Sequence, residues 1–189
     1  FRYCELENCN FQPSRENIFQ KAYFYYFDYS TSSFSSSDTI LNQVWDISKY
    51  SMKATSFAGI YIDGDRERIP YEADAYINQL GHYYTDREYS LGRASNEYFM
   101  DHPTWPTEWI LHTVLMFYND YMFTGNRESL EYWYEKLKHK TLTSLAREDG
   151  LISSKLVTEE IMKNLGFRNT KERIRDIVDW PPAQKDTGW

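Results

Sequence analysis

The sequence contains no uninterrupted apolar run long enough to cross a bilayer as a helix, so we expect no membrane span. Basic residues are in the minority: 21 Lys and Arg stand against 28 Asp and Glu, for a net charge of -7. This balance argues against a nucleic-acid partner, because proteins that bind phosphate backbones normally present a basic face. The first residues contain neither a basic nor an apolar leader region, and we expect a secretory signal to be absent or already removed.

Cysteine is also scarce. The two copies, Cys4 and Cys9, lie too close together for a disulfide framework to be inferred, and no metal-ligating residues accompany them. We interpret them as ordinary thiols. The compartment in which the protein works therefore stays open.

Aromatic residues, in contrast, are abundant. The chain of 189 residues is 41% hydrophobic and 18% aromatic, which is one domain's worth of sequence with a substantial core. Flat amphipathic rings serve both as core filler and as stacking platforms for ligands. Trp45 and Trp133 lie on helical apolar stripes, and we expect both in the core.

The chain changes character near residue 38. Residues 22–30 are rich in Phe and Tyr and place Tyr23, Tyr25, Phe27 and Tyr29 on one face of an extended segment, which predicts a strand. A serine-rich tract then breaks the pattern, and Ser37 or Asp38 is suited to cap a helix. We therefore expect a β remnant with a linker over 1–37 and helices over 38–189.

Apolar residues at three- and four-residue spacings predict six helices in the second part, each with one buried side. Their approximate ranges are 38–55, 73–84, 91–99, 107–123, 130–145 and 156–165. The fourth is apolar almost all round, so other helices should enclose it. Residues 174–178 are predicted to form a short helix or turn. Short connections between helices indicate successive helical hairpins and an all-α fold.

One charged stretch, between the first two predicted helices, needs a chemical explanation. It reads Asp-Gly-Asp-Arg-Glu-Arg-Ile-Pro-Tyr-Glu-Ala-Asp over residues 63–74. Hydrolysis of a glycosidic bond needs one carboxylic acid to protonate the leaving oxygen and a second carboxylate to activate water or attack the sugar. Crowded carboxylates suit this task, because like charges at short range raise the pKa of one member and leave it protonated.

Two other interpretations of this stretch stay open on composition alone. A solvated, salt-bridged start of a helix would carry the same charges. Asp63-Gly64-Asp65 also has a faint likeness to a calcium loop, but the remaining ligand spacing of such loops is missing. We expect neither a metal nor another cofactor.

The same stretch resembles the catalytic signature of α-L-rhamnosidases of glycoside hydrolase family 78. Asp-His-Pro-Thr-Trp-Pro-Thr-Glu-Trp at 101–109 is similar to a second block of that family, and Asp-Ile-Val-Asp-Trp at 176–180 to a further active-site block. Phe-Arg-Tyr at 1–3 is similar to the last strand of the β-sandwich domain that precedes the catalytic domain. The resemblance implies a six-hairpin alpha/alpha toroid and inverting hydrolysis of terminal α-L-rhamnosyl residues.

The resemblance also implies roles for individual residues. Glu67 corresponds to the general acid, Tyr71 to an aromatic wall of the sugar pocket, and Asp74 to a residue that contacts the sugar. Asp63 or Asp65 matches the Asp that binds rhamnose hydroxyls. The expected ligand is thus a rhamnosylated glycan or glycoside.

Further residues are placed around the substrate. Arg66 can orient the carboxylates, and Trp105 or Trp109, together with Trp180, would form the aromatic walls. Glu72 is expected to be only a charge at the start of a helix, which suits the positive end of the helix dipole. His102 could hydrogen-bond a sugar or serve as a capping or surface residue, and both interpretations stay open.

Two departures from the family pattern affect the prediction. Many members have Trp where Tyr71 stands, and no residue of this chain matches the Glu that serves as their general base. A ring of twelve helices of about 11–12 residues each also needs more chain than follows residue 38. We therefore expect about half a toroid, inactive alone, whose exposed apolar helix faces favour self-association. The alternative is a noncatalytic helical module that binds carbohydrate or another protein.

Overall fold

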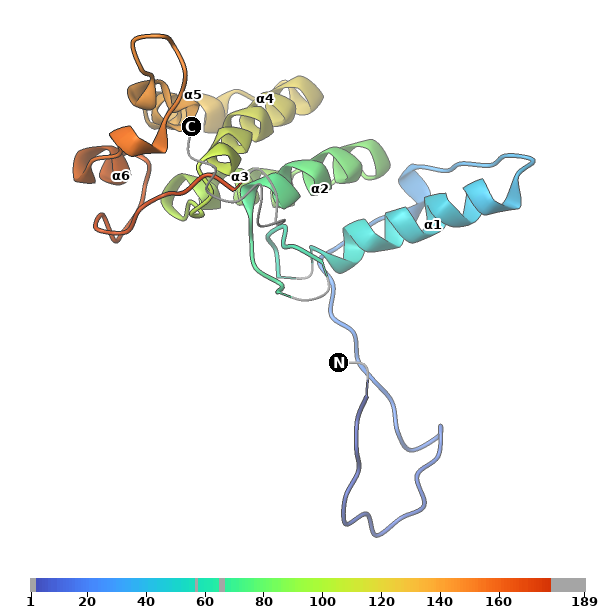
Figure 1. Ribbon diagram of the computed structural model, residues 1–189. Coiled ribbons are helices and arrows are strands. Elements are labelled where there is room, and N and C mark those ends of the chain that lie inside the picture. The colour runs from blue at the N-terminus through green and yellow to red at the C-terminus, as the bar shows by residue number, and fades with distance from the viewer. Residues whose placement is uncertain (1–2, 57, 65–66, 178–189) are drawn as a thin grey trace.

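A computed structural model describes residues 3–56, 58–64 and 67–177, and within these ranges the regular structure is helical, with no β-strand. The α-helices are α1 (Thr39–Ala54), α2 (Glu72–Thr85), α3 (Ser90–Asp101), α4 (His112–Thr124), α5 (Glu128–Leu137) and α6 (Glu159–Asn164) (Figure 1). Short 3-10 helices are η1 (Tyr29–Thr31), η2 (Glu108–Leu111), η3 (Lys138–Thr141), η4 (Thr143–Leu145) and η5 (Ser154–Leu156). The predicted all-α class is confirmed.

Local signals in the sequence set several helix ends. The Asp38 carboxylate accepts a hydrogen bond from the Ile40 N–H at 2.8 Å, so Asp38, one of the two predicted caps, begins α1. Gly125 has a left-handed φ of 67°, and its N–H donates to the Tyr121 carbonyl at the end of α4.

The helices alternate along the chain between two layers, with α2 and α4 in one layer and α3 and α5 in the other. α2 packs against α4, while α3 packs against both α4 and α5, and α1 covers α2 (Figure 1). Because consecutive helices of a hairpin run in opposite directions, α2 and α4 run in the same direction. The segments that precede α2 and α4 therefore meet at one end of the layers.

Three apolar clusters fill the spaces between helices. Tyr61, Ala75, Leu91, Phe99 and Met116 join α2, α3 and α4. A second cluster, around Met100, Phe117 and Leu137, joins α3, α4 and α5. The third lies under the last part of the chain and contains Ile110, Leu142, Leu145, Val157, Met162, Leu165 and Ile174. Tyr61, in the first of these clusters, lies directly before the charged stretch.

The strand predicted over residues 22–30 is not formed. Residues 3–28 contain no helix or strand, and Figure 1 shows that the first part of the chain loops away from the helices. Tyr23 and Tyr26 are exposed. An alternating pattern makes a strand only where a neighbouring strand accepts its hydrogen bonds, and the described part of the chain offers none.

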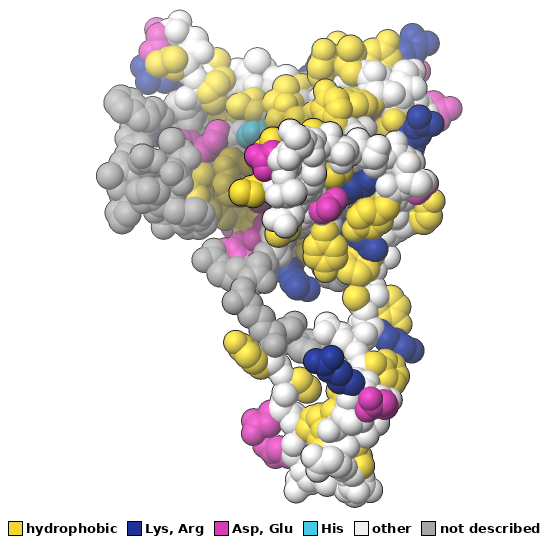
Figure 2. Space-filling model, turned by 90° about the vertical axis from the view of Figure 1, so that its right-hand side faces the viewer, with side chains coloured by type: hydrophobic (Ala, Val, Ile, Leu, Met, Phe, Trp, Pro, Cys, Tyr) yellow, Lys and Arg dark blue, Asp and Glu magenta, His cyan; other side chains and the backbone are white. Residues whose placement is uncertain are grey.

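Some predicted burial is also wrong. Ile40, Val44 and Ile47, which form the apolar stripe of α1, are 66%, 51% and 64% exposed. On α4, Tyr118 and Met122 are exposed as well, so the helix is not enclosed on every side. Figure 2 shows hydrophobic side chains at many places on the surface of the helical part. No described element covers these faces.

The two tryptophans expected in the core are only half-buried. Trp45 on α1 packs against Phe34, with ring centroids 5.6 Å apart, and Lys49 lies over its ring. Trp133 on α5 packs at the edge of the cluster around Phe117. Both tryptophans therefore pack at the edge of the core and not inside it.

Candidate active site

The charged stretch forms a loop whose two ends are tied together just before α2. The Asp63 N–H donates to the Ile69 carbonyl at 2.9 Å, and the Asp63 carboxylate accepts from the Ile69 N–H at 3.0 Å. Arg68 has a left-handed φ of 55°, which helps to reverse the chain direction inside the loop. Asp65 and Arg66, both predicted to contact substrate, lie outside the described residues.

The base of the loop is anchored in the core. The Tyr61 N–H donates to the Ser95 hydroxyl at 3.1 Å, and Asn78 donates to the Ile62 carbonyl at 3.1 Å. The Tyr61 hydroxyl lies 2.6 Å from Nδ1 of His82. Tyr61 and Ile62 are buried, so the loop projects from a fixed point between α2 and α3.

Glu67 and Tyr71 form a hydrogen-bonded pair at the exit of the loop. The Tyr71 hydroxyl donates to Oε2 of Glu67 at 2.8 Å. Partial burial first, and then the hydrogen bond and charge of Glu67, raise the pKa of Tyr71 to about 12. The phenol therefore stays protonated at neutral pH and remains a donor to the Glu67 carboxylate.

Asp74 completes a cluster of carboxylates. It lies in the first turn of α2, is half-buried, and its pKa is raised by burial and by the charges of Asp63 and Glu67. The structure thus brings Asp63, Glu67 and Asp74 close enough to interact electrostatically. Beside them, the Trp109 ring meets Tyr71 edge-on, with centroids 5.3 Å apart. The cluster therefore combines three carboxylates, one of them with a raised pKa, and an aromatic wall.

The expectation that Glu72 is only a charge at a helix start is wrong. Its side chain is fully buried, and its carboxylate accepts from the Thr104 N–H at 2.8 Å and from the Thr104 hydroxyl. Burial raises its pKa. Glu72 therefore fixes the second sequence block against the start of α2.

Lys140 is a buried cation that interacts electrostatically with Glu72. Its ammonium group donates to the carbonyls of Phe99 at 2.8 Å and Leu165 at 2.6 Å. Burial lowers the pKa of Lys140 to about 8, and the charge of Glu72 opposes this change. Lys140 lies 41 residues from Phe99 and 25 residues from Leu165 in the sequence. Contacts between residues so far apart leave no periodic pattern, so the sequence did not indicate the role of Lys140.

The described start of the third block lies beside the second. Arg175 pairs with Pro106 in a parallel bridge, in which the Thr107 N–H donates to the Arg175 carbonyl at 2.9 Å. The Arg175 guanidinium lies over the Trp105 ring, 4.7 Å from its centroid. The segment 174–177 is therefore extended rather than the predicted helix or turn.

Glu108 adds a further contact between these blocks, because its carboxylate accepts from the Ile177 N–H at 2.9 Å. Trp180 lies outside the described residues. The predicted residues that the structure brings together are thus Asp63, Glu67, Tyr71, Asp74 and Trp109, while Trp105 lies against Arg175.

The chemical options of the site follow from its groups. The described ranges contain no set of three or more His, Cys, Asp and Glu side chains placed to hold a metal ion. Helices in the same ranges are all too short or too polar to cross a membrane. What the cluster can do is donate or accept a proton and hydrogen-bond a ligand rich in hydroxyl groups.

Comparison with known proteins gives one family. A family model described as bacterial alpha-L-rhamnosidase 6 hairpin glycosidase domain matches residues 29–185. The match includes all six α-helices and the three sequence blocks, and it leaves out most of the extended first segment. A search of curated proteins and a search of solved structures each gave no match.

Proposed function

This chain belongs to the family of bacterial α-L-rhamnosidase six-hairpin glycosidase domains, and on that premise we propose that it carries the acid side of an inverting α-L-rhamnosidase site. The family is one of glycosidases with a carbohydrate substrate. The observation that carries the proposal is the hydrogen bond from Tyr71 to Glu67, within a cluster that also contains Asp63 and Asp74.

In this proposal Glu67 protonates the glycosidic oxygen as the bond to rhamnose breaks. The Tyr71 hydroxyl, 2.8 Å away, holds the carboxyl group in one orientation. Asp63 and Asp74 accept hydrogen bonds from sugar hydroxyls, which charged acceptors bind more strongly than neutral ones. The edge-on pair of Tyr71 and Trp109 packs against the apolar face of the sugar.

Inversion requires a second carboxylate that activates a water molecule on the opposite face of the sugar, with the two carboxyl groups roughly 6.5–9.5 Å apart. We propose that this base comes from sequence outside this chain. Asp65, Arg66, Trp105 and Trp180 remain predicted substrate contacts. The first anomer released, observed by NMR, tests the mechanism: an α-rhamnoside that gives the β anomer inverts.

The test of the function is a substitution at Glu67 in the protein with a complete catalytic domain. Glu67→Gln should lower kcat/KM on an aryl α-L-rhamnoside by about 10²–10⁴-fold, because a carboxamide cannot donate the acid proton. Rhamnose binding should persist. Glu131→Gln, on the exposed face of α5, is the matched control and should leave kcat/KM unchanged.

Other outcomes identify what is wrong. Wild-type protein that binds rhamnose without cleaving any aryl glycoside would support the alternative, a noncatalytic carbohydrate-binding or interaction module. Cleavage of a different aryl glycoside would keep the reaction class and reject rhamnose as the sugar.

We also propose that this chain, expressed alone, self-associates through its uncovered helix faces. The residues concerned include Ile40, Val44 and Ile47 on α1, with Tyr118 and Met122 on α4. Analytical ultracentrifugation should show oligomers at micromolar concentration. A monodisperse, well-folded monomer would reject this proposal and leave the proposed reaction unaffected.

A further inference from the structure

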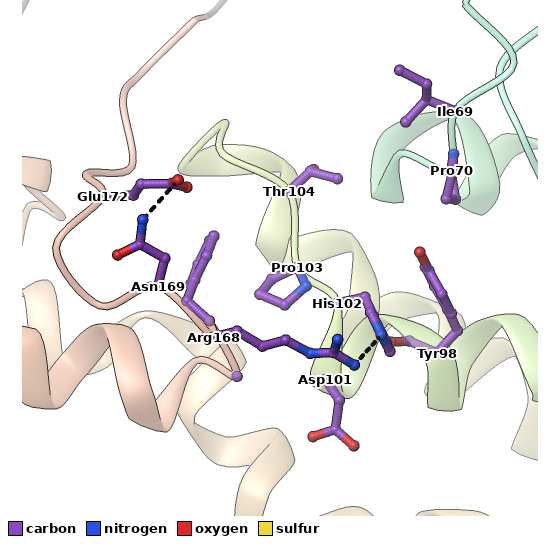
Figure 3. A pocket seen from close by; sticks show the side chains of 12 residues that line it. Ile69, Pro70, Tyr98, Asp101, His102, Pro103, Thr104, Arg168, Asn169 and Glu172 are labelled. Carbon is purple, nitrogen blue, oxygen red and sulfur yellow. Dashed lines mark hydrogen bonds between the residues drawn. The ribbon is translucent and has the colours of Figure 1, made fainter.

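A cavity of about 360 Å³ opens next to the acid-bearing loop. Its walls come from Ile69 and Pro70 of that loop, from residues 98–104 at the end of α3, and from residues 166–172 after α6 (Figure 3). None of the residues proposed above to hold rhamnose lines it. The volume lies in the range of small-molecule sites, roughly 300–1,000 Å³.

Buried contacts fix the walls of this cavity in place. Gly166 has a φ of 93°, and a Cβ at this position would collide with the Met100 carbonyl, so only glycine allows the two walls to approach. Lys140 ties the same two walls through the carbonyls of Phe99 and Leu165. The Glu72–Thr104 contact joins the third wall to them. The cavity is therefore a formed part of the fold.

A stacked pair of rings lines one side. The His102 imidazole lies parallel to the Tyr98 ring, with centroids 4.3 Å apart and planes at 5° (Figure 3). Its Nδ1 lies 3.1 Å from the Tyr98 carbonyl, which can only accept, and its Nε2 lies 2.8 Å from an Arg168 nitrogen, which can only donate. The imidazole thus donates from Nδ1 to the Tyr98 carbonyl and accepts at Nε2 from the Arg168 guanidinium.

The charges around the cavity restrict the ligand. Two carboxylates, Asp101 and Glu172, line it together with one guanidinium, that of Arg168. Glu172 accepts from the Asn169 amide at 2.9 Å, and Asp101 lies 4.0 Å from the Lys136 ammonium outside the cavity lining. A negatively charged ligand would be repelled by two carboxylates and attracted by only one guanidinium group. An anionic ligand is therefore disfavoured.

A wholly apolar ligand is disfavoured too. It would displace the water molecules that hydrogen-bond to the charged and amide groups, and it could not make those hydrogen bonds itself. The rings of Tyr98, Pro70, Pro103 and Phe167 offer flat apolar surfaces between these polar groups. Flat surfaces interspersed with charged donors and acceptors match a neutral ring that bears several hydroxyl groups, which is a neutral sugar.

We propose that this cavity binds a neutral sugar unit on the leaving-group side of the bond that is cleaved. This inference rests on the proposed function, since it takes Glu67 as the proton donor. The donor must lie beside the leaving oxygen, and Ile69 and Pro70, which wall the cavity, follow Glu67 by two and three positions in the same loop. The natural substrate would then be a rhamnosyl group attached to a neutral sugar.

The experiment compares kcat/KM on three substrates that share the α-L-rhamnosyl group, with the complete catalytic domain as enzyme. Their leaving groups are a neutral hexose, a hexuronic acid and a simple phenol. Arg168→Gln and Glu172→Gln change exposed side chains that line the cavity. Arg127→Gln, at an exposed arginine before α5, is the matched control.

Wild type should favour the hexose over the hexuronic acid. Each cavity variant should lower kcat/KM on the rhamnosyl-hexose by about fivefold to tenfold, and on the phenyl rhamnoside by less than about twofold. The control should change neither. Unchanged thermal midpoints establish that the variants are folded, and Asn169→Ala provides a further cavity variant if one of them is not.

The experiment distinguishes failure of the cavity assignment from failure of the proposed function. Equal losses on the hexose and phenyl substrates, no loss on either, or a wild-type preference for the hexuronic acid would overturn the cavity assignment while leaving the rhamnosidase proposal in place. Wild type that cleaves none of the three rhamnosides would overturn the proposed function, and the cavity assignment with it.

Discussion

Two carboxylates that are two positions apart, Glu72 and Asp74, have opposite surroundings at the start of α2. Glu72 is fully buried and bonded to Thr104, whereas Asp74 is half-buried among the acids of the loop. Successive helical positions differ by about 100° around the axis, so residues two apart point to nearly opposite sides. The difference shows that the carboxylates of this charged stretch have two roles. Asp74 can contact a substrate, whereas Glu72 holds the surrounding structure in place.

The largest expected effect on stability tests the buried side of this comparison. Glu72→Ala should lower the free energy of unfolding by about 1–3 kcal/mol, because it leaves the Thr104 N–H without its acceptor and removes a charge that favours the ammonium form of Lys140. Urea unfolding measures the loss. Asp74→Asn should cost much less, since Asp74 is half-buried and already destabilised as an anion by its neighbours.

Equal losses of stability for Glu72→Ala and Asp74→Asn would contradict the division between a supporting and a functional carboxylate. Glu72→Gln provides an intermediate point, because its amide oxygen can still accept from the Thr104 N–H. Its unfolding free energy should lie between those of wild type and Glu72→Ala.

A smaller effect concerns Lys140 and pH. In the folded protein the pKa of Lys140 is about 8, whereas the ordinary value for lysine in an unfolded chain is 10.5. Between these values the unfolded state binds more protons, so the free energy of unfolding should rise as pH increases from 8 to 9, with a slope of at most about 1.4 kcal/mol per pH unit. The interval ends at pH 9 because Tyr71, whose pKa is raised, opposes the rise at higher pH. Lys140→Met should flatten this rise.

The matched control is Lys138→Met, two positions away. Lys138 is exposed and pairs with Glu135, which raises its pKa, so its removal should leave the rise between pH 8 and 9 in place. A wild-type stability that falls over this interval, or an unaltered slope in Lys140→Met, would contradict the assignment.

The smallest effect tests the functional side. Tyr71→Phe removes the hydroxyl that donates to Glu67 and so favours the protonated form of that acid. The alkaline limb of the kcat profile should shift to higher pH, with a modest loss of kcat. Tyr134→Phe, on the exposed face of α5, should leave the limb where it is. A shift to lower pH in Tyr71→Phe would contradict the role of the hydroxyl as donor.

Much of the helical framework was predictable because its signals are local. Asp38 and Gly125 mark helix ends through their own backbone and side-chain chemistry. Apolar residues at three- and four-residue spacings correctly predicted α2, α3 and α4. The same spacing extended α5 too far, because Leu137 and Leu145 keep one apolar period but belong to different clusters, separated by a left-handed Leu142.

The supporting contacts of the site were not predictable from the sequence. Glu72 meets Thr104, and His102 meets Arg168, across separations of 32 and 66 residues that no periodicity encodes. Burial of the α1 stripe was predicted from its pattern alone, yet Ile40 is exposed because no described element packs there. The acid cluster itself, by contrast, was visible because its members are close in sequence.

The central claim is that Glu67 donates the proton to the leaving oxygen while Asp74 only binds the sugar. It is tested most directly by kcat/KM of Glu67→Gln and Asp74→Asn on two aryl α-L-rhamnosides, one whose phenol departs without protonation and one whose phenol needs it. We predict that Glu67→Gln loses far more activity on the second substrate than on the first, whereas Asp74→Asn loses similar activity on both. Equal losses for Glu67→Gln on the two substrates, or selective loss in Asp74→Asn, would contradict the account.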